Sequence, residues 1–500
     1  MALINIPAIF LAVVGFVVLR YLFSTKGNPI NWPIVGMLPC TILNLHRAHE
    51  KITEVLEDNG LTYLYKGPWF SNVKFLGTID PANINYIWSS NFSNFPKGSD
   101  FSRIFSFIGD GIFSSDSDSW KNQRKLAQAF LKHRRFNQFS LETCRNMVEK
   151  ALVPVLELVA DQGSVVDLQD LFQRFTFDIT CELVTGFNPK CLSPEFPEVE
   201  FSKALENGEE GVFYRYFFPE PFWKFQRWLG FGPEWRMQKA QKVLNDVSAE
   251  YILRKREQLK EQSDSGEGVD LLTSYMSTEA EINGAKAGDK FLRDTFVNFL
   301  FAGRGTTSSA LTWFFWSVSK NPQVLYKIRE EIKEKMPENR FCISDTKELN
   351  SLVYLHGALC ETLRLYPPVP FNHKSPKQED VLPSGHRVKP NTKIAFSMYS
   401  MGRMASIWGE DRLEFTPERW INEAGTIKHE AAHKFPAFGA GPRICTGKEI
   451  AFTQMKTVAA FILHNYNIEL QETKTLPIAS NSILLHMKNG LKVKVSRRWI

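Results

Sequence analysis

The chain of 500 residues has few cysteines, and none of them forms a paired motif. Its seven cysteines are scattered, their number is odd, and no CxxC occurs, so the sequence indicates neither a disulfide framework nor a zinc ribbon. No GxGxxG turn or Walker loop is present, so we expect no flavin or nicotinamide site within the chain. There is no internal repeat. The net charge of +6, from 60 basic and 54 acidic residues, is too small to indicate a nucleic-acid partner.

An apolar run occupies the N-terminus. Residues 2–22 are interrupted only by Asn5 and Arg20, and the run is long enough to cross a bilayer as a helix. No basic residue precedes it, whereas Arg20 and Lys26 follow, which predicts a cytosolic body. A cleaved signal peptide fits less well because a basic n-region and a clear small-residue cleavage site are missing. We expect a transmembrane signal anchor over 2–22, followed by a stiff proline-rich joint over 26–40.

The remaining residues, 41–500, are predicted to form one unit. Strand-like runs lie at 61–69 and 73–79, and long helical patterns dominate from about 120 to 365. Beyond 365 the sequence turns to prolines, glycines and short strands, before one more helical pattern follows Cys445. This order predicts a mainly α fold with a smaller β-rich part.

One glycine-rich loop carries a chemical signal. The segment FPAFGAGPRICTG holds Cys445 immediately before a helical pattern, and the N-terminus of a helix favours a thiolate. Gly439, Gly441 and Gly447 remove side chains, so backbone can approach a flat, bulky partner. Arg443 can reach an anionic group on that partner. A haem offers both the flat ring and the anionic propionates, and a thiolate is an axial ligand that favours O–O cleavage.

The loop resembles the haem loop of the cytochrome P450 family, F-x-x-G-x-R-x-C-x-G, at every fixed position. The matching residues are Phe438, Gly441, Arg443, Cys445 and Gly447. The resemblance implies a haem-thiolate monooxygenase that binds haem b, with Cys445 as the axial ligand of the iron. It also implies that electrons come from NADPH only indirectly, through a cytochrome P450 reductase. The expected location is the endoplasmic reticulum membrane, with a single span and a cytosolic catalytic domain.

Further motifs follow in the order of the family. ETLR and FTPERW supply Glu361, Arg364 and Arg419, which resemble the structural Glu-Arg-Arg triad of the family core. WKNQR supplies Trp120 and Arg124, which match the pair that contacts a haem propionate. His373 is a weaker candidate for the same contact because its spacing is loose.

The apolar run over 296–316 is predicted to be the helix above the iron. Ala302, Gly303 and Thr306 match the family pattern (A/G)-G-x-(D/E)-T, in which the threonine hydroxyl manages bound oxygen. Thr306 is therefore the candidate catalytic residue. The acid of the pattern is replaced by Gly305. We expect this glycine to widen the groove and to make proton delivery slower or leakier, up to impaired activity, unless the chemistry depends less on proton delivery.

The substrate pocket is predicted to be apolar and to take a small apolar molecule. By analogy with the family its candidate lining residues are Phe299, Ala302, Gly303, Val369 and Phe371. Within the family the chain most resembles the plant branch with fatty-acid and alkane hydroxylases, which implies a long aliphatic substrate. A related lineage couples phenols in alkaloid formation, and a non-catalytic membrane haem protein is a third alternative. The aromatic stretch 212–235 is a candidate lipid contact, and the basic run 131–136 with Lys448 is a candidate reductase contact.

Overall fold

The structure is a computed structural model that describes residues 15–16, 28–71, 73–261, 269–277, 288–336, 346–473 and 475–498. The predicted anchor over 2–22 lies outside these residues except at positions 15 and 16. Among the described residues, no helix combines the length and apolar character needed to cross a bilayer. Of the predicted joint, residues 28–37 are non-helical, and the first helix after them begins at Leu38.

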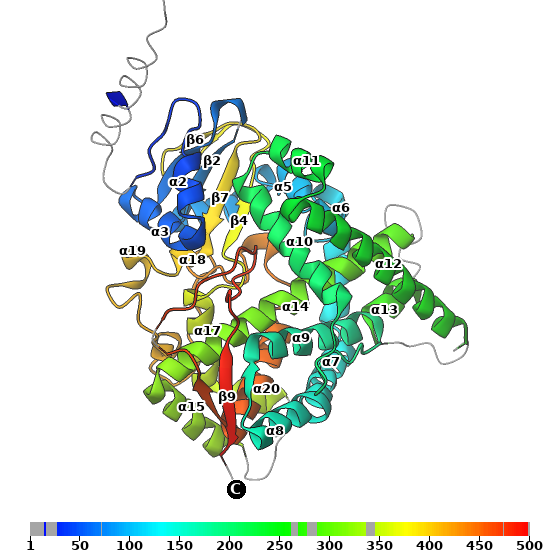
Figure 1. Ribbon diagram of the computed structural model, residues 1–500. Helices are drawn as coiled ribbons and strands as arrows, with labels where there is room; N and C mark the ends of the chain where they lie inside the picture. Colours follow the sequence, from blue (N-terminus) through cyan, green and yellow to red (C-terminus); the bar gives the residue numbers. More distant parts are fainter. Residues whose placement is uncertain are drawn as a thin grey trace, which may run out of the picture.

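Helices form most of the molecule (Figure 1). In the first half of the chain they are α2 (Leu38–Leu43), α3 (Ala48–Asp58), α4 (Pro81–Asn85), α5 (Ser99–Ile104), α6 (Ser117–Leu131), α7 (Arg134–Met147), α8 (Val153–Gln162), α9 (Leu168–Thr185), α10 (Glu200–Phe217), α11 (Glu220–Leu229) and α12 (Gly232–Glu261). In the second half they are α13 (Leu271–Ser277), α14 (Asp289–Lys320), α15 (Pro322–Lys335), α16 (Thr346–Ser351), α17 (Val353–Leu365), α18 (Met398–Met401), α19 (Ala405–Trp408) and α20 (Lys448–Asn465).

Helix α14 runs through the middle of the molecule (Figure 1) and packs against α9, α12, α17 and α20. Over most of its 32 residues, side chains on every face of α14 are buried, which is the pattern of a helix that lies inside a large core. The predicted helix over 296–316 is therefore confirmed. Helix α20 follows the cysteine loop as expected, and its apolar side chains join the same core.

The larger sheet has four strands in the order β1-β2-β7-β4. The strands are β1 (Thr62–Lys66), β2 (Lys74–Thr78), β7 (Lys393–Ser397) and β4 (Phe371–Lys374). β1 pairs antiparallel with β2, Leu64 opposite Leu76, and β2 pairs parallel with β7, Leu76 opposite Ile394. The sheet joins the predicted N-terminal strand pair to the segment after residue 365, so β4 is carried to the edge of the helical core.

The other strands form two smaller sheets. β3 (Val165–Asp167), β9 (Lys492–Arg497) and β8 (Tyr466–Leu470) form an antiparallel sheet in that order, and β5 (Asp380–Val381) pairs with β6 (Arg387–Val388). The pairing of β3 with β9 ties the end of the chain to the start of α9. The fold is therefore mainly α with a small β part, as predicted.

Candidate functional site

A cavity of about 370 Å³ lies in the core between α14 and the cysteine loop. Cys445 lines it from one side, and Ala302, Gly303 and Thr306 of α14 line it as well. The structure therefore brings together the loop and the helix that sequence reasoning placed on opposite sides of a bound group. The other predicted residues that line it are Trp120, Arg124, Phe299, Val369, Phe371, Phe438, Arg443 and Gly447.

Cys445 lies just before the first turn of α20, whose N-cap is Gly447. Its backbone N–H donates to the Phe438 carbonyl at 2.7 Å, which closes the loop. The cysteine is exposed, and the surface that it exposes is cavity wall. Burial raises the pKa of the Cys445 thiol, whereas a hydrogen bond from the Gly447 backbone and the charges of Arg124 and Lys448 lower it. Burial is the larger effect, so the pKa of the thiol is raised overall and the helix N-terminus does not by itself give the predicted thiolate. A cation bound at the sulfur would favour the thiolate form.

Gly441 and Gly447 differ in the space that a side chain would have at their positions. Gly441 begins the short 3₁₀ turn η8 (Gly441–Arg443) with φ +65°, and a Cβ on it would stand 1.8 Å from the Trp88 carbonyl oxygen. No other residue fits there without moving backbone. A Cβ on Gly447 would meet only the Cys445 sulfur, at 3.9 Å. The space beside Gly447 is therefore open toward the cavity, where a flat ligand would lie.

Four cationic side chains contribute to the cavity wall. They are Lys97, Arg124, Lys374 and Arg443, and Lys97, Lys374 and Arg443 repel one another electrostatically, as do Arg124 and Arg443. The nearby acid is Asp116, which pairs with Arg443 at 2.5 Å. Burial and this repulsion lower the pKa of Lys374 to about 7 and of Arg443 to about 10, and hold the pKa of Lys97 well below its usual range.

This cluster is a test of whether the chain fits a haem. Buried like charges are costly unless an opposite charge offsets them, and Asp116 alone does not offset Lys97, Lys374 and Arg443, whose pKa values are all lowered. The Nε of Arg443 is buried without a hydrogen-bond partner. A ligand with two carboxylates, such as the propionates of haem b, would supply the missing charge and the missing acceptor. The cluster and the accessible Cys445 sulfur therefore fit this group.

Helix α6 places Trp120 and Arg124 one turn apart, so both reach the cavity. The Arg443 guanidinium lies 4.4 Å from the centre of the Trp120 ring, and Arg124 donates to the Ile444 carbonyl at 2.7 Å. The indole thus covers one face of the cation while Arg124 fixes the loop next to Cys445. Both residues lie where the sequence placed them, beside the haem loop.

The structure places Lys374 in the cavity wall, and His373 is not among the lining residues. His373 is buried, its Nδ1 lies 2.9 Å from the Tyr216 hydroxyl, and its Nε2 lies 3.9 Å from Asp100. Neighbouring residues of a strand point to opposite faces, and Lys374 of β4 lies on the cavity side while His373 contacts Tyr216 and Asp100. Lys374 is therefore better placed than His373 for a contact with a propionate.

The groove of α14 is lined by small and hydroxyl-bearing side chains. Thr306 donates from Oγ1 to the Ala302 carbonyl at 2.6 Å, which leaves the lone pairs of its hydroxyl for a hydrogen bond from the cavity. A Cβ on Gly303 would stand 2.6 Å from the Thr180 hydroxyl oxygen of α9. Gly303 therefore allows α14 to pack closely against α9, and it also leaves space above the cysteine loop.

Gly305 does not act as expected. It is not among the residues that line the cavity, and a Cβ on it would stand 2.3 Å from Cδ1 of Leu484 and 3.2 Å from Oε1 of Glu209. Its missing side chain makes room for Leu484, which itself lines the cavity. Gly305 therefore adds no open space of its own to the groove, because Leu484, from the far end of the sequence, occupies the place of its side chain.

The Glu-Arg-Arg group lies behind the site. Glu361 and Arg364 are fully buried and form two hydrogen bonds, at 2.7 and 2.8 Å. Further donors to the carboxylate are the Trp420 indole at 2.9 Å and the Thr416 backbone N–H at 3.0 Å. Arg419 approaches Glu361 only to 3.6 Å, without a hydrogen bond, and pairs with Asp411 at 2.7 Å. The predicted triad is therefore present as an ion-pair group, because Arg419 lies in ion-pair distance of Glu361, and Trp420 and Thr416 add the hydrogen bonds that Arg419 does not make.

Away from the cationic cluster the cavity is mostly apolar. Its walls there include Phe105, Phe113, Phe299, Val369, Ile483 and Leu484. Among the described residues that line the cavity, none is an aspartate or a glutamate. Asn298 is taken up by backbone partners, since it accepts from Phe113 N–H at 3.1 Å and donates to the Ile108 and Asp294 carbonyls.

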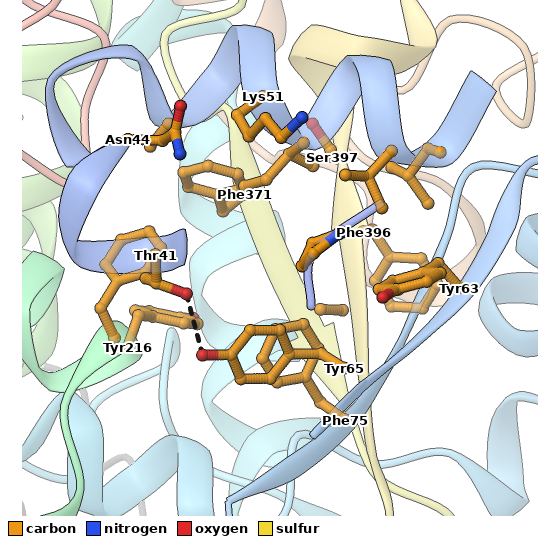
Figure 2. Close-up of a pocket in the computed structure, with 18 of the residues that line it drawn as sticks. Thr41, Asn44, Lys51, Tyr63, Tyr65, Phe75, Tyr216, Phe371, Phe396 and Ser397 are labelled. Atoms are coloured by element: carbon orange, nitrogen blue, oxygen red, sulfur yellow. Dashed lines mark hydrogen bonds between the residues drawn. The ribbon is translucent and has the colours of Figure 1, made fainter. Parts of the chain in front are cut away.

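A smaller cavity of about 140 Å³ adjoins the first (Figure 2). It lies between α3, β1, β2, β4 and β7, and its polar hydroxyls are paired, with Thr41 and Tyr65 2.9 Å apart. Tyr216, Phe371 and Asn372 line both cavities. These three residues therefore form a wall that the two spaces share.

Several residues of the site carried no sequence signal that we used. Lys97, Lys374, Asp116 and Leu484 lie up to 387 residues apart in the sequence, and only the folded chain brings them together. Lys374 came nearest to having a sequence signal, because it is next to the candidate His373. On a strand, side chains alternate between the two faces, so only one of these two neighbours can face the cavity.

Comparison with known proteins gives consistent relatives. The family model described as Cytochrome P450 matches residues 27–495. The chain is 45% identical to alkane hydroxylase MAH1 of Arabidopsis thaliana over 96% of each chain. It is 41% identical to noroxomaritidine synthase 1 of Narcissus pseudonarcissus, covering 95% of this chain and 93% of that protein. It is 38% identical to cytochrome P450 86B1 of Arabidopsis thaliana, covering 99% and 91%.

Proposed function

Because this chain belongs to the cytochrome P450 family of haem b monooxygenases, we propose that it hydroxylates a long-chain aliphatic compound, an alkane or a fatty acid. When bound, the haem activates O₂ with electrons that originate from NADPH and arrive through a reductase. Cys445 would hold the iron, and the cluster of Lys97, Arg124, Lys374 and Arg443 would hold the propionates.

The observation that carries the substrate class is the composition of the large cavity. Its substrate side is apolar, and no carboxylate lines it among the described residues. A cationic amine would lose its hydration there without gaining a counter-ion, which is costly. A neutral aliphatic chain loses nothing polar, and each buried methylene contributes about 0.8 kcal/mol. The similarity to alkane hydroxylase MAH1 supports the same class.

Thr306 is the proposed catalytic residue of the groove. Its hydroxyl donates to Ala302 and can accept a hydrogen bond from a water molecule in the cavity. The neighbouring Thr307 also lines the cavity. Together the two hydroxyls would order water at the place where protons are consumed, while Glu361, Arg364 and their donors keep the core behind the loop rigid.

Exposed apolar residues support the proposal that the protein contacts a membrane. Helix α11 and the turn after it expose Phe222, Phe225, Trp228, Leu229 and Phe231, and the region around α2 exposes Ile34, Val35, Ile42 and Leu43. In Figure 1 both α2 and α11 lie at the upper end of the molecule. Such patches mark contact surfaces. We propose that this end faces the endoplasmic reticulum membrane. The anchor over 2–22 would span the membrane, and the catalytic domain 41–500 would lie on its cytosolic side.

The electron donor would dock near the cysteine loop. Lys132, Arg134 and Arg135 are exposed at the junction of α6 and α7, and Lys448 begins α20 next to Cys445. A basic face of this kind attracts an acidic partner. A cytochrome P450 reductase on the same membrane is the proposed partner.

Oxidative coupling of phenols is the alternative function. It rests on the resemblance to the alkaloid-forming lineage, and the relatives include noroxomaritidine synthases. The test is product identification by mass spectrometry, with the chain and a plant reductase in microsomes, NADPH, and a long-chain alkane, a fatty acid or a diphenolic amine as substrate. An aliphatic alcohol supports the proposal. A coupled phenol, with no aliphatic product, contradicts it.

A further inference from the structure

The segment 480–487, here called the C-terminal loop, contributes Ile483 and Leu484 to the cavity wall. The loop is closed on itself, because the Ser480 N–H donates to the His486 carbonyl at 2.9 Å and Lys488 N–H to Ile478 at 2.8 Å. Leu484 stands near its tip and is 2% exposed. One part of this side chain faces the cavity, and Cδ1 faces Gly305 of α14.

The contact between Leu484 and Gly305 leaves no room for a side chain on the helix. A Cβ on residue 305 would stand 2.3 Å from Cδ1 of Leu484, which is far inside van der Waals contact. Any substitution there must displace Leu484, the loop that carries it, or the helix. The direction of that displacement decides whether the cavity changes.

Hydrogen bonds of Leu485 tie the C-terminal loop to two neighbouring segments. The Leu485 carbonyl accepts from Ser309 Oγ and from the Trp313 indole, both at 2.7 Å, and the Leu485 N–H donates to Pro368 at 2.9 Å. The backbone on the C-terminal side of Leu484 is thus tied to α14 and to the segment before β4. These hydrogen bonds restrain the loop backbone next to Leu484.

A buried carboxylate holds the other side of the loop. Glu209 of α10, 2% exposed, accepts from Ser482 Oγ at 3.3 Å and lies 3.2 Å from His486 Nε2, while its backbone carbonyl accepts from Ile483 N–H at 3.4 Å. Its only cationic neighbour on α14 is Arg304, whose Nη1 lies 4.0 Å from Oε1 of Glu209. One acid therefore fixes residues 482, 483 and 486 around Leu484.

From these contacts we propose that Gly305 is a specificity-determining residue that acts through Leu484, with Glu209 as the positioning residue that makes the coupling rigid. Because the loop backbone is fixed on both sides, a methyl group at position 305 moves the Leu484 side chain into the cavity. The absence of a side chain at 305 thus sets the width of the cavity beside α14. The inference rests on the proposed function only in taking the ligand of this cavity to be aliphatic.

The test uses probes that do not depend on the natural substrate. 1-Methylimidazole and 1-dodecylimidazole bind haem iron in the holoenzyme, and their dissociation constants are read from optical titration without turnover. Gly305→Ala is expected to weaken 1-dodecylimidazole about tenfold and 1-methylimidazole less than twofold. Adding Leu484→Ala to Gly305→Ala is expected to restore the affinity for the long probe. Equal affinities of Gly305→Ala and the wild type for the long probe would overturn the proposal, as would a double variant without recovery.

Controls separate this coupling from general strain. Gly211→Ala is the matched variant, since a Cβ there would meet Met237 at 2.7 Å and neither residue lines the cavity; it should leave both dissociation constants unchanged. Glu209→Ala should reduce the penalty of Gly305→Ala, because the loop can then move outward, and an unchanged penalty refutes the positioning role. If Gly305→Ala does not fold, Leu484→Ala alone should bind the long probe at least threefold more tightly, and unchanged affinity again overturns the proposal.

The same variants connect the inference to the reaction. Gly305→Ala should shift the position of hydroxylation along an aliphatic chain, relative to the wild type, while the imidazole titration reports the cavity independently. If no aliphatic substrate turns over but the titrations behave as expected, the proposed substrate is wrong and the coupling stands. If an aliphatic product forms but the titrations show no coupling, the proposed substrate class stands and the coupling between Gly305 and Leu484 is wrong.

Discussion

The Arg443 guanidinium, which lines the large cavity, forms an ion pair at 2.5 Å with the Asp116 carboxylate behind the cavity wall. Asp116 also accepts from the backbone N–H groups of Lys97 and Gly98, at 3.0 and 2.8 Å, so the acid is held by the same turn that carries one of the lysines. This arrangement orders Arg443 and yet leaves the cationic cluster with an excess of positive charge. That excess is what a dicarboxylate ligand would neutralise.

Removing one buried lysine should therefore weaken haem retention. For Lys374→Met we expect haem to be lost to excess apomyoglobin about tenfold faster than from the wild type, since hydrogen bonds to charged groups contribute about 1.5–3 kcal/mol. Lys393→Met is the matched control, because Lys393 pairs with Asp100 and does not line the large cavity. Equal loss rates for Lys374→Met and the wild type would show that Lys374 does not face the propionates.

Thr306→Val should uncouple the enzyme. The valine keeps the shape of the side chain and removes the hydroxyl that donates to Ala302, so the product rate is expected to fall at least about tenfold while more NADPH electrons appear as hydrogen peroxide. Thr306→Ser should keep most of the coupling. Product and peroxide are measured together per NADPH consumed, and a valine variant with wild-type coupling would remove Thr306 from the mechanism.

Trp420→Phe should destabilise the core more than its loss of area suggests. The indole donates to the buried Glu361 at 2.9 Å, and a hydrogen bond to a charged group contributes about 1.5–3 kcal/mol. The unfolding midpoint in urea measures the change. Trp228→Phe is the control, since Trp228 is 79% exposed and should leave the midpoint unchanged. Equal midpoints for Trp420→Phe and Trp228→Phe would contradict the role given to the indole.

Acid should unfold the chain partly through His49. Burial and the charge of Arg403 lower its pKa to about 3, whereas an unfolded histidine titrates near 6.5. Between these values the unfolded chain binds a proton that the folded chain does not, so stability falls as the pH drops from about 6.5 toward 3, by up to about 1.4 kcal/mol per pH unit. In the His49→Gln variant the free energy of unfolding should fall less steeply with decreasing pH, by up to about 1.4 kcal/mol per pH unit. The exposed His46→Gln should not, and equal slopes in the two variants would exclude His49.

Much of the architecture was predictable from local pattern. The strands near 61–69 and 73–79, the long central helix and the helix after Cys445 all formed, because each depends on alternation or on helical periodicity within one segment. The haem loop was predictable for a different reason. Gly441 is confined by its positive φ and by the Trp88 carbonyl, so a specific sequence is needed there.

What could not be predicted depends on contacts between distant segments. Lys374 rather than His373 faces the cavity because the register of β4 against β7 settles which residue points inward. Trp420 and Thr416 donate hydrogen bonds to Glu361 beside the predicted ion pair with Arg419, whose guanidinium also pairs with Asp411. Gly305 was interpreted as a missing acid, whereas the structure shows that Leu484, 179 positions later, fills its space.

A competition in one reaction between a long-chain alkane that ends in a tert-butyl group and an alkyltrimethylammonium ion of equal length tests whether the cavity takes neutral aliphatic chains. The cation has no lone pair for iron and has the same shape as this alkane, so the charge distinguishes the two within the cavity. With the chain, a plant reductase and NADPH in microsomes, we expect the alkane to be hydroxylated at least about tenfold faster, because burying the cation beside no carboxylate is unfavourable. Equal or preferred hydroxylation of the cation would contradict the account of the cavity as a site for neutral aliphatic chains.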